Sequence, residues 1–475
     1  MLKSQYNQPK KTPMTDIIAN RQNAVDIVKT LRRAGFRAFI VGGAVRDMVL
    51  GKSPKDFDIA TDAPPEEVER LFEHVYPVGA QFGVSLVRIG KDIYEVARFR
   101  KDGAYQDGRR PVSVEPAGEI EDVNRRDFTI NALIWDPEED RIIDHVDGIA
   151  DIRNRIIRTV GDPVQRFGED RLRMLRAVRF AARFEYSIEP VTLEAIRQNA
   201  SSIFEVSCER IGEELCKMFT GPHPDQALIL LDESSLLQLI LPEVSALKGV
   251  IQSPEYHPEG DVSEHTLQML KMFGGGSATL AFGILFHDIG KPATFKMTDR
   301  ARFNRHDEAG AETAVRIMKR LRFESAVISQ VRDLVRKHMQ FMNVRAMKRS
   351  TLRRFMAQPA FEEMLELYRL DSLASHGQLD IYTFLKEEIA RERTHNRTLN
   401  LPERLVSGED LISMGLEPGP LFKTILDEVM DAQLEGKIST RSEALAFLKE
   451  HFSPPVRKIP EQKSTEPDPP AFHDA

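Results

Sequence analysis

The sequence predicts an α+β fold, with a small mixed β-sheet near the N-terminus and helices in the remainder. Short β-rich runs alternate with helical segments over residues 21–160, whereas apolar spacing after about residue 162 is almost entirely helical. The chain has 475 residues, 41% of them hydrophobic and 29% charged, which is typical of a multidomain globular protein. No apolar run approaches the roughly 18 residues that a membrane-spanning helix needs, so no contact with a membrane is expected.

Composition shifts divide the chain into regions. The first 20 residues are polar and lack the apolar core of a secretory signal, while residues 453–475 carry six prolines. Only two cysteines occur, Cys208 and Cys216, so a disulfide framework is excluded and a cytoplasmic location is expected. The expected regions are a disordered lead (1–20), a mixed head (21–160), a helical neck (161–245), a helical region rich in histidine (255–380), a helical tail (381–452) and a disordered tail (453–475).

The head is expected to contain several short strands. A helix over residues 27–31 ends near Gly35, and a strand follows before a Gly-Gly pair. The segment DGAYQDGRRP (102–111) has several glycine or proline breakers and no apolar period, so it is expected to be a mobile loop. The expected strands are 36–41, 56–60, 83–89, 94–99 and 142–146.

Helical spacing dominates the rest of the chain. The pattern is weaker from residue 380 to residue 450. The expected helices are 166–184, 190–200, 209–219, 224–235, 263–273, 278–288, 308–321, 324–340, 349–357 and 360–375. Leu172, Leu175 and Val178 are expected to face the core.

A pair of aspartates stands out in the head. Asp56 and Asp58 in DFDIAT (56–61) alternate on the expected strand at 56–60, so both carboxylates project from the same face. Two neighbouring carboxylates are costly unless a cation lies between them, and Mg²⁺ suits one or two carboxylates together with substrate phosphates. An isolated Asp-x-Asp sequence is more often a surface turn, so the pair needs support from its context.

The motif GGAVRD (42–47) supplies that context. Gly42 and Gly43 allow backbone amides to approach a phosphate closely at a turn that opens into a helix. Arg46 lies one turn into this helix and is expected to reach the same phosphates. Together, the glycine turn and the aspartate pair predict a site for a nucleoside triphosphate.

A basic stretch follows the head. Residues 153–183 contain nine arginines against three acidic residues, although the whole chain has a net charge of -7. Concentrated arginine is suited to phosphate binding, whereas the ordinary interpretation is a solvated helix face. The neck is therefore a candidate nucleic-acid surface.

Five motifs, spread in order from the head to the neck, resemble those of the class II nucleotidyltransferases. This class comprises the transfer-RNA CCA-adding enzymes, their CC- and A-adding relatives, and bacterial poly(A) polymerases. The resemblance covers about residues 20–245. It implies a polymerase-beta-like head, a helical neck, and a helical body and tail that hold RNA. The motifs are GGAVRD, DFDIAT, RRDFTINA (125–132), EDRLRMLRAVRFAARF (169–184) and CERIGEEL (208–215).

The resemblance also implies roles for individual residues. Two Mg²⁺ ions about 3.5–4 Å apart would activate the RNA 3′-hydroxyl and neutralise the leaving pyrophosphate. Glu95, on the expected strand at 94–99, is a candidate third carboxylate. The implied roles are metal binding for Asp56 and Asp58, triphosphate contact for Gly43 and Arg46, nucleotide binding for Arg126, and orientation of the sugar and the head for Asp127 and Asn131.

The neck motif suggests how a base could be selected without a template. Asp170 and Arg173 are spaced i, i+3, so they are expected to be neighbours on one helix face. A carboxylate accepts hydrogen bonds and a guanidinium donates them, so the pair suits cytosine and adenine and mismatches uracil and guanine. The alternative is a simple intrahelical ion pair. We expect Arg176 near the nucleotide and Arg179 at the head–neck interface or on a phosphate, while the resemblance implies nucleotide binding for both.

A second set of candidate ligands lies in the helical region at 255–380. Imidazole and carboxylate groups together favour a divalent transition metal such as Mn²⁺, Ni²⁺ or Fe²⁺. The adjacent His287-Asp288 pair in FHDIGKP resembles the motif of HD-superfamily phosphohydrolases, a domain that many bacterial CCA-adding enzymes carry. The resemblance implies one metal on His265, His287, Asp288 and Asp371, and a second that His306 and His338 could add.

The sequence therefore predicts a nucleotidyltransferase that adds C, A or both to tRNA 3′ ends from CTP and ATP. One alternative is a bacterial poly(A) polymerase, although VGAQFG (78–83) lacks the basic pair expected there. Another is an HD phosphohydrolase whose head only binds RNA, and a third is a non-catalytic RNA-binding protein. The presence of both acidic sets argues against these last two interpretations. The oligomeric state stays open.

Overall fold

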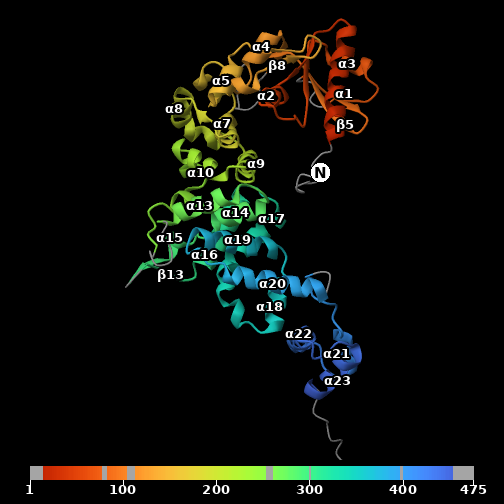
Figure 1. The fold of residues 1–475 in the computed structure, drawn as a ribbon, viewed down its shortest axis with the longest axis vertical. Coiled ribbons are helices and arrows are strands. Elements are labelled where there is room, and N and C mark those ends of the chain that lie inside the picture. Colours follow the sequence, from red (N-terminus) through yellow and green to blue (C-terminus); the bar gives the residue numbers. More distant parts are fainter. Residues whose placement is uncertain are drawn as a thin grey trace, which may run out of the picture. The chain divides into compact units, whose positions relative to one another are not determined.

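The computed structural model describes residues 14–77, 83–103, 113–252, 260–298, 301–395 and 399–452. It confirms the α+β fold: strands concentrate in the red and orange N-terminal part of the ribbon, and helices follow from yellow to blue (Figure 1). The chain divides into two compact units, Met1–Phe341 with Glu362–Tyr382, and Met342–Phe361 with Thr383–Ala475. Among the described residues, no helix has both the length and the apolar character to cross a membrane.

The head is built on a seven-stranded sheet with the order β3-β4-β5-β2-β1-β8-β9. Strand β2 pairs with β5 in parallel, and the other neighbours are antiparallel. The expected strands are confirmed in outline, but Asp56 lies just before its strand rather than within it, because β2 begins at Asp58. The strands are β1 (Ala38–Val41), β2 (Asp58–Thr61), β3 (Val75–Pro77), β4 (Val84–Ile89), β5 (Asp92–Arg98), β8 (Ile134–Asp136) and β9 (Arg141–Ile143).

Helices and a small ribbon complete the head. Helix α1 begins at Met14, so the expected disordered lead is wrong for residues 14–20, and residues 1–13 lie outside the described range. Most of the expected loop at 102–111 also lies outside it. One face of the sheet packs through Phe39, Phe99 and Ile134. The remaining elements are α1 (Met14–Arg33), α2 (Gly43–Val49), α3 (Pro65–Leu71), β6 (Arg100–Asp102), β7 (Val114–Pro116), α4 (Glu119–Asn124), η2 (Thr129–Asn131) and α5 (Gly148–Asn154).

In the neck, the expected single helix at 166–184 is wrong. Residues 166–184 form two helices, because Asp170 adopts extended backbone angles (φ -140°, ψ 107°) between them and its carboxyl accepts a hydrogen bond from Leu172 N (3.1 Å). The expected core positions Leu172, Leu175 and Val178 are all buried. The elements are β10 (Ile156–Ile157), α6 (Pro163–Glu169), α7 (Leu172–Phe184), β11 (Ser187–Ile188), α8 (Pro190–Asn199), η3 (Ala200–Glu205), α9 (Cys208–Phe219), α10 (Pro224–Glu233), α11 (Leu237–Ile240) and α12 (Pro242–Ser245).

The histidine-rich region is helical as expected, with one addition. A β-hairpin, β12 (Phe295–Met297) with β13 (Ala301–Phe303), connects the segment after α14 to α16. Its strands of three residues are too short to produce a periodic sequence signal. The helices are α13 (Val262–Phe273), α14 (Ala278–Phe286), α15 (Lys291–Thr294), α16 (His306–Arg320), α17 (Ser325–Lys337), η4 (His338–Ala346) and α19 (Phe361–Ala374).

The second unit has its own apolar core. Leu411, Ile425 and Leu448 are fully buried in it. Residues 453–475, the expected disordered tail, lie outside the described range. The helices of this unit are α18 (Arg349–Met356), α20 (Asp380–His395), α21 (Gly408–Ser413), α22 (Pro420–Leu434) and α23 (Arg441–Phe452).

Candidate functional site

Three carboxylates gather on neighbouring parts of the head sheet. Parallel pairing aligns Ile59 with Val96, so Asp58 and Glu95, one residue earlier on each strand, share one face. Asp58 reaches solvent as a residue, yet protein atoms crowd its carboxyl, and this burial, with the charges of Glu95 and Asp56, raises its pKa to about 6 against the pull of Arg126. A group of acids that raises a pKa in this way is suited to a divalent cation, and oxygen ligands favour Mg²⁺.

The glycine turn lies directly beside this acidic group. Gly42 has a φ of +77° and precedes α2, and a Cβ there would meet Arg126 Nη1 at 3.2 Å and Asp58 Oδ2 at 3.9 Å. Both the left-handed backbone and the close neighbours therefore require glycine. The turn brings the backbone of Gly43 and the side chain of Arg126 next to the Asp58 carboxyl, as expected for a site that receives a triphosphate.

Arg46 is held rigidly behind the turn. It is 5% exposed, and it donates hydrogen bonds to Asn131 Oδ1 (2.5 Å) and to Asp47 Oδ1 (2.9 Å from Nε and 2.7 Å from Nη2). Burial lowers its pKa while Asp47 raises it, and the guanidinium stays charged because arginine remains protonated far above neutral pH. Its Nη2 lies 3.5 Å from the position of a Cβ on Gly43, so the charge sits close to the expected phosphates.

The segment RRDFTINA connects the head to the neck. Arg126 Nη2 donates to Asp122 Oδ2 (3.0 Å), which fixes the guanidinium beside Gly42. The buried Asp127 accepts hydrogen bonds from Asn131 Nδ2 (3.2 Å) and from Arg176 Nε (2.8 Å) and Nη2 (2.5 Å). Burial alone would raise the pKa of Asp127, but the charge of Arg176 and these hydrogen bonds hold it below its usual value. Asp127 thus links Arg176 of α7, in the neck, to Asn131 of the head.

Asp170 and Arg173 do not pair through their side chains, and Asp170 lies outside α7, contrary to the expectation that both lie on one helix face. Asp170 lies between α6 and α7, where Arg210 Nη2 approaches its two carboxyl oxygens at 3.2 and 2.9 Å. Arg173 donates to Glu169 Oε2 (2.6 Å) and to the Arg125 carbonyl (3.0 Å) instead. The alternative of an intrahelical Asp170–Arg173 ion pair is therefore wrong.

The next two arginines of α7 also have carboxylate partners. Arg176 binds the head through Asp127, whereas Arg179 Nε donates to Glu214 Oε2 of α9 (2.6 Å) within the neck. The expected interface position thus belongs to Arg176 rather than to Arg179. Glu214 and Arg210 received no role from the sequence, although their i, i+4 spacing in CERIGEEL placed them on one helix face.

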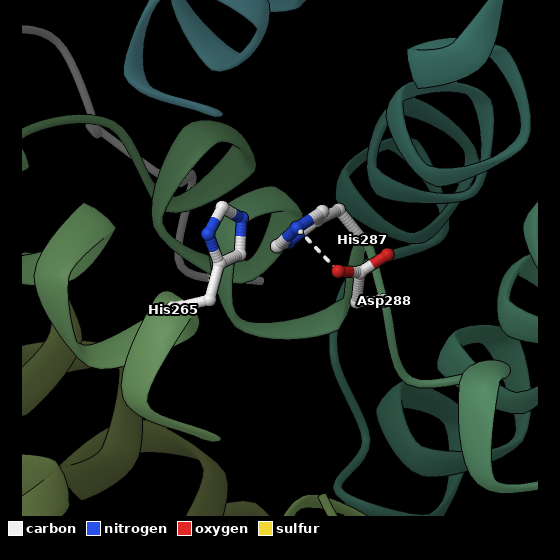
Figure 2. A group of neighbouring side chains, drawn as sticks. All are labelled: His265, His287 and Asp288. Carbon is white, nitrogen blue, oxygen red and sulfur yellow. Dashed lines mark ion pairs between the residues drawn. The ribbon is translucent and has the colours of Figure 1, made fainter. Parts of the chain in front are cut away.

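The second candidate site brings together ligands from five separate segments. The ligand atoms of His265, His287 and Asp288 lie within 4.8 Å of one another, and Figure 2 shows these side chains converging. Asp288 also belongs to a second such group with His306 and His338. The last member, Asp371 on α19, places Oδ1 3.1 Å from His265 Nε2. The six candidate ligands that the sequence singled out are therefore neighbours in space.

Backbone carbonyls orient three of these imidazoles. The Nδ1 atoms of His287, His306 and His338 lie 2.8, 2.8 and 2.6 Å from the carbonyl oxygens three residues earlier in the chain. A carbonyl only accepts hydrogen bonds, so Nδ1 carries the proton and the Nε2 lone pair points into the cluster. His306 Nε2 and His338 Nε2 then face each other at 3.2 Å as two lone pairs, a contact that a shared cation would stabilise.

The electrostatics of the cluster favour a metal ion over a proton. Burial and the charges of His287 and His306 lower the pKa of His338 to about 4, so this imidazole is neutral at physiological pH. Burial alone would raise the pKa of Asp288, but His287 and Lys291 hold it well below its usual value. Lys291 Nζ donates to Asp288 Oδ2 (2.6 Å) and to Gln252 Oε1 (2.5 Å), and sequence reasoning assigned it no role. Imidazole nitrogens around an ionised carboxylate suit a divalent transition metal.

A mixed sheet that carries clustered carboxylates beside a glycine turn, followed by an arginine-rich helical neck, has the architecture of a nucleotidyltransferase head and neck. Three sequence families match parts of the chain: "Poly A polymerase head domain" over residues 38–158, "Probable RNA and SrmB-binding site of polymerase A" over 185–248, and "tRNA nucleotidyltransferase domain 2" over 307–448.

Individual relatives carry a narrower description. A CCA-adding enzyme of Lactobacillus helveticus is 43% identical over 230 residues, which cover 48% of this chain and 57% of that protein. A CCA-adding enzyme of Geobacillus stearothermophilus is 45% identical over 216 residues, which cover 45% of this chain and 53% of that protein. The chain thus spans little more than half the length of these relatives. The chain is therefore similar to CCA-adding enzymes over about half of its length, and its residues 38–158 match the head domain of poly(A) polymerases.

Solved structures share the fold over most of the chain. The CCA-adding enzyme of Bacillus stearothermophilus in complex with CTP is 28% identical, has a TM-score of 0.71, and matches 90% of this chain and 96% of its own. The CCA-adding enzyme of Thermotoga maritima complexed with tRNA is 18% identical with a TM-score of 0.57, over 92% of this chain and 98% of its own. The nucleotidyltransferase head followed by a helical body is therefore the architecture of this chain.

Proposed function

We propose that this protein adds C, A or both to the 3′ end of tRNA, using CTP and ATP with two Mg²⁺ ions. The observation that carries this proposal is the position of Asp58, which is flanked by Glu95 and lies beside the Gly42 turn and Arg126. The bound metal ions would supply a Lewis acid for the RNA 3′-hydroxyl and for the leaving pyrophosphate. The relatives named as CCA-adding enzymes support the choice of tRNA.

The residues of the head would hold and orient the reactants. Asp56 and Asp58, with Glu95 beside them, would ligate Mg²⁺ through carboxylate oxygens. Gly43 allows the triphosphate to approach its backbone, and Arg46 carries a fixed positive charge towards the same phosphates. Because Asn131 and Asp47 already fix Arg46, little reorganisation is needed when the nucleotide binds.

The neck would select the base. Asp170 offers a carboxylate that accepts a hydrogen bond from the amino group of cytosine or adenine, and Arg173 offers donors for their ring acceptors. Arg210 fixes Asp170, and Glu169 with the Arg125 carbonyl fixes Arg173, so each group has its own support. Two independently held groups present a pattern that uracil and guanine cannot match without leaving a buried polar atom unpaired, which costs about 1–3 kcal/mol.

A primer-extension assay tests this function. Purified protein is incubated with tRNAs that lack one, two or three terminal nucleotides, and with an oligoadenylate primer, in the presence of each labelled nucleoside triphosphate. We expect incorporation of CTP, ATP or both on tRNA, ending after at most three nucleotides. Long A tails on the unrelated primer would instead identify a poly(A) polymerase, and the absence of incorporation with any primer would contradict the proposal.

We also propose a metal-dependent phosphohydrolase activity in the histidine cluster. The 3.2 Å contact between His306 Nε2 and His338 Nε2, with Asp288 common to two ligand groups, favours metal binding by both groups. His265, His287, Asp288 and Asp371 would hold one ion, and His306 and His338 would complete the other. The bound metal would activate water for attack on a phosphomonoester or a 2′,3′-cyclic phosphate at an RNA end.

Separate variants distinguish the two activities. Asp288→Ala removes the shared ligand and should abolish hydrolysis of p-nitrophenyl phosphate and of 2′,3′-cyclic AMP by Mn²⁺- or Ni²⁺-loaded protein, while leaving nucleotide addition intact. If the wild-type protein hydrolyses neither compound with any of these metals, the phosphohydrolase proposal fails.

Cys208 and Cys216 are both free thiols, which supports a place of action in the cytoplasm.

A further inference from the structure

A second group of positive charges surrounds Phe184, where α2 and α7 both end. The guanidinium carbon of Arg46 lies 4.8 Å from the centre of the Phe184 ring, that of Arg183 lies 5.3 Å away, and Lys52 Nζ lies 5.5 Å away. We call Lys52, Arg183 and Phe184 the Phe184 patch. Arg46 connects the patch to the glycine turn, because it contacts both the ring and the Gly43 side of the head.

The charges of the patch are not balanced by nearby acids. Arg46 is paired with Asp47, whereas Lys52 and Arg183 are exposed and form no ion pair with any described residue. The other three arginines of α7 each bind a carboxylate: Arg173 binds Glu169, Arg176 binds Asp127 and Arg179 binds Glu214. Burial and the charge of Arg183 both oppose the positive charge on Arg46. A bound anion would relieve this repulsion.

The patch lies at the C-terminal end of α2, whereas the triphosphate site lies at its N-terminal end, and Arg46 stands between them. Gly43 begins α2 and Lys52 follows its last residue by three positions, and seven helical residues span about 10 Å. A phosphate held by Lys52 and Arg183 would therefore lie on the far side of Arg46 from those beside Gly43. The Phe184 ring is packed against Phe180 and Tyr186, and two exposed cations lie next to it. Two cations held beside one ring are suited to the phosphates of a polynucleotide strand.

We propose that the Phe184 patch binds a backbone phosphodiester of the RNA strand whose 3′ end enters the head. This inference rests on the proposed function, since that function makes RNA a substrate. Lys52 and Arg183 would neutralise backbone phosphate and release its condensed counterions, so they would contribute to affinity without reading sequence. Phe184 would hold the two cations apart and limit where the strand can pass.

Salt-dependent RNA binding tests the patch. The dissociation constant of a stem–loop RNA with a single-stranded 3′ end is measured for the full chain at 0.1–1 M KCl, without any nucleotide. For the double variant Lys52→Gln/Arg183→Gln, we expect the slope of log K against log [KCl] to become less negative by about 1.4, at about 0.7 for each contact with a single strand. If the wild type and the double variant bind RNA equally tightly at 1 M KCl, this difference in slope makes the double variant bind about 25-fold more weakly at 0.1 M KCl.

Arg33→Gln is the matched control. Arg33 also lies exposed in the last turn of a helix and forms no ion pair with a described residue, but α1 leads into the end of β1 that is far from Gly42. Its slope and affinity should equal those of the wild type, and circular dichroism should show all three proteins folded. The patch proposal is wrong if the double variant binds RNA as the control does, or if it weakens only CTP binding.

The outcome separates the patch from the proposed function, because binding is measured without catalysis. A chain that adds no nucleotide to any primer, yet loses RNA affinity in the double variant, would overturn the proposed function and leave the patch standing. A chain that adds nucleotides normally, and whose double variant keeps wild-type RNA affinity and salt slope, would overturn the patch alone.

Discussion

The head carboxylates and the histidine cluster are two candidate metal sites of opposite design. Asp56, Asp58 and Glu95 are exposed to solvent, whereas His265 and His287 in the helical region are 0% and 1% exposed. An open group of oxygen ligands suits an ion that arrives with its nucleotide, because Mg²⁺ keeps several waters and binds substrate phosphates. A buried group of imidazoles, three of them oriented by backbone carbonyls, suits an ion that stays bound between reactions.

The two sites also differ in how their charges are compensated. In the head, Arg126 lies beside the Asp58 carboxyl, and near Phe184 the positive charge exceeds what the described acids neutralise. In the cluster, Lys291 is the cation bound to Asp288, and the remaining candidate ligands are four imidazoles and the Asp371 carboxylate. The head is thus prepared for a highly charged substrate, and the cluster for a metal ion.

The largest expected effect concerns the open site. Asp58→Ala removes a ligand and should reduce nucleotide addition at least about a thousandfold, because a metal ion contributes several kcal/mol of transition-state stabilisation. Hydrolysis by the histidine cluster should not change. Single-turnover incorporation of labelled CTP or ATP measures the first effect, and p-nitrophenyl phosphate hydrolysis measures the second. A variant with near wild-type addition would show that Asp58 is no metal ligand.

Removal of metal ions should affect the two sites differently, because only the ion in the histidine cluster is expected to stabilise the fold. Brief treatment with EDTA followed by excess Mg²⁺ should restore nucleotide addition at once. Prolonged chelation that empties the buried cluster should destabilise the fold by about 2.7 kcal/mol if the metal had been present at a hundred times its dissociation constant. Elemental analysis and thermal unfolding measure the effect, which should be absent in Asp288→Ala. If the thermal unfolding midpoint of the wild type does not change on chelation, the cluster holds no permanently bound metal.

Base selection should depend on Asp170. Asp170→Ala removes the acceptor for the amino group of cytosine or adenine, so discrimination between CTP and UTP should fall about 10- to 100-fold, which corresponds to about 1–3 kcal/mol. The measurement is kcat/KM for each nucleotide on the same tRNA. Unchanged discrimination, with only a lower overall rate, would assign Asp170 a structural role.

A smaller effect is expected for Arg210, which fixes Asp170 from α9. Arg210→Gln should weaken the same discrimination about 2- to 5-fold, since a part-exposed ion pair contributes up to about 1 kcal/mol. Arg322→Gln is the control, because Arg322 forms an exposed ion pair with Glu209 of the same helix and touches no candidate site residue. Equal effects of both substitutions would mean that Arg210 only stabilises the helix.

The sequence predicted much of the fold where periodicity was strong. The strands around Ile40 and Val87 and the helices around Leu215 and Ile317 follow from apolar spacing and end near the expected residues. It failed where a single residue overrides the pattern: the apolar period runs through Asp170, but the side chain of Asp170 caps the next helix and divides the segment. Short strands such as those of the β12–β13 hairpin have no period to detect.

The candidate site shows the same limit. Asp56, Asp58 and the histidine set could be identified because their chemistry is visible in single residues or short motifs. Arg210 could not, because its partner Asp170 lies 40 residues away in the sequence. Lys291 was missed although it follows Asp288 by only three residues, while its other partner, Gln252, lies 39 residues away. The charge of Arg183 was counted in the basic stretch, but its lack of a carboxylate partner emerges only when the other arginines of α7 are seen paired.

Anomalous scattering from crystals grown with Mn²⁺ and CTP tests the central claim most directly. The account predicts manganese beside the carboxylates of Asp56 and Asp58, in contact with a triphosphate that lies against Gly43 and Arg46, in addition to any metal in the histidine cluster. Manganese in the cluster alone, with the nucleotide bound elsewhere or absent, would contradict it.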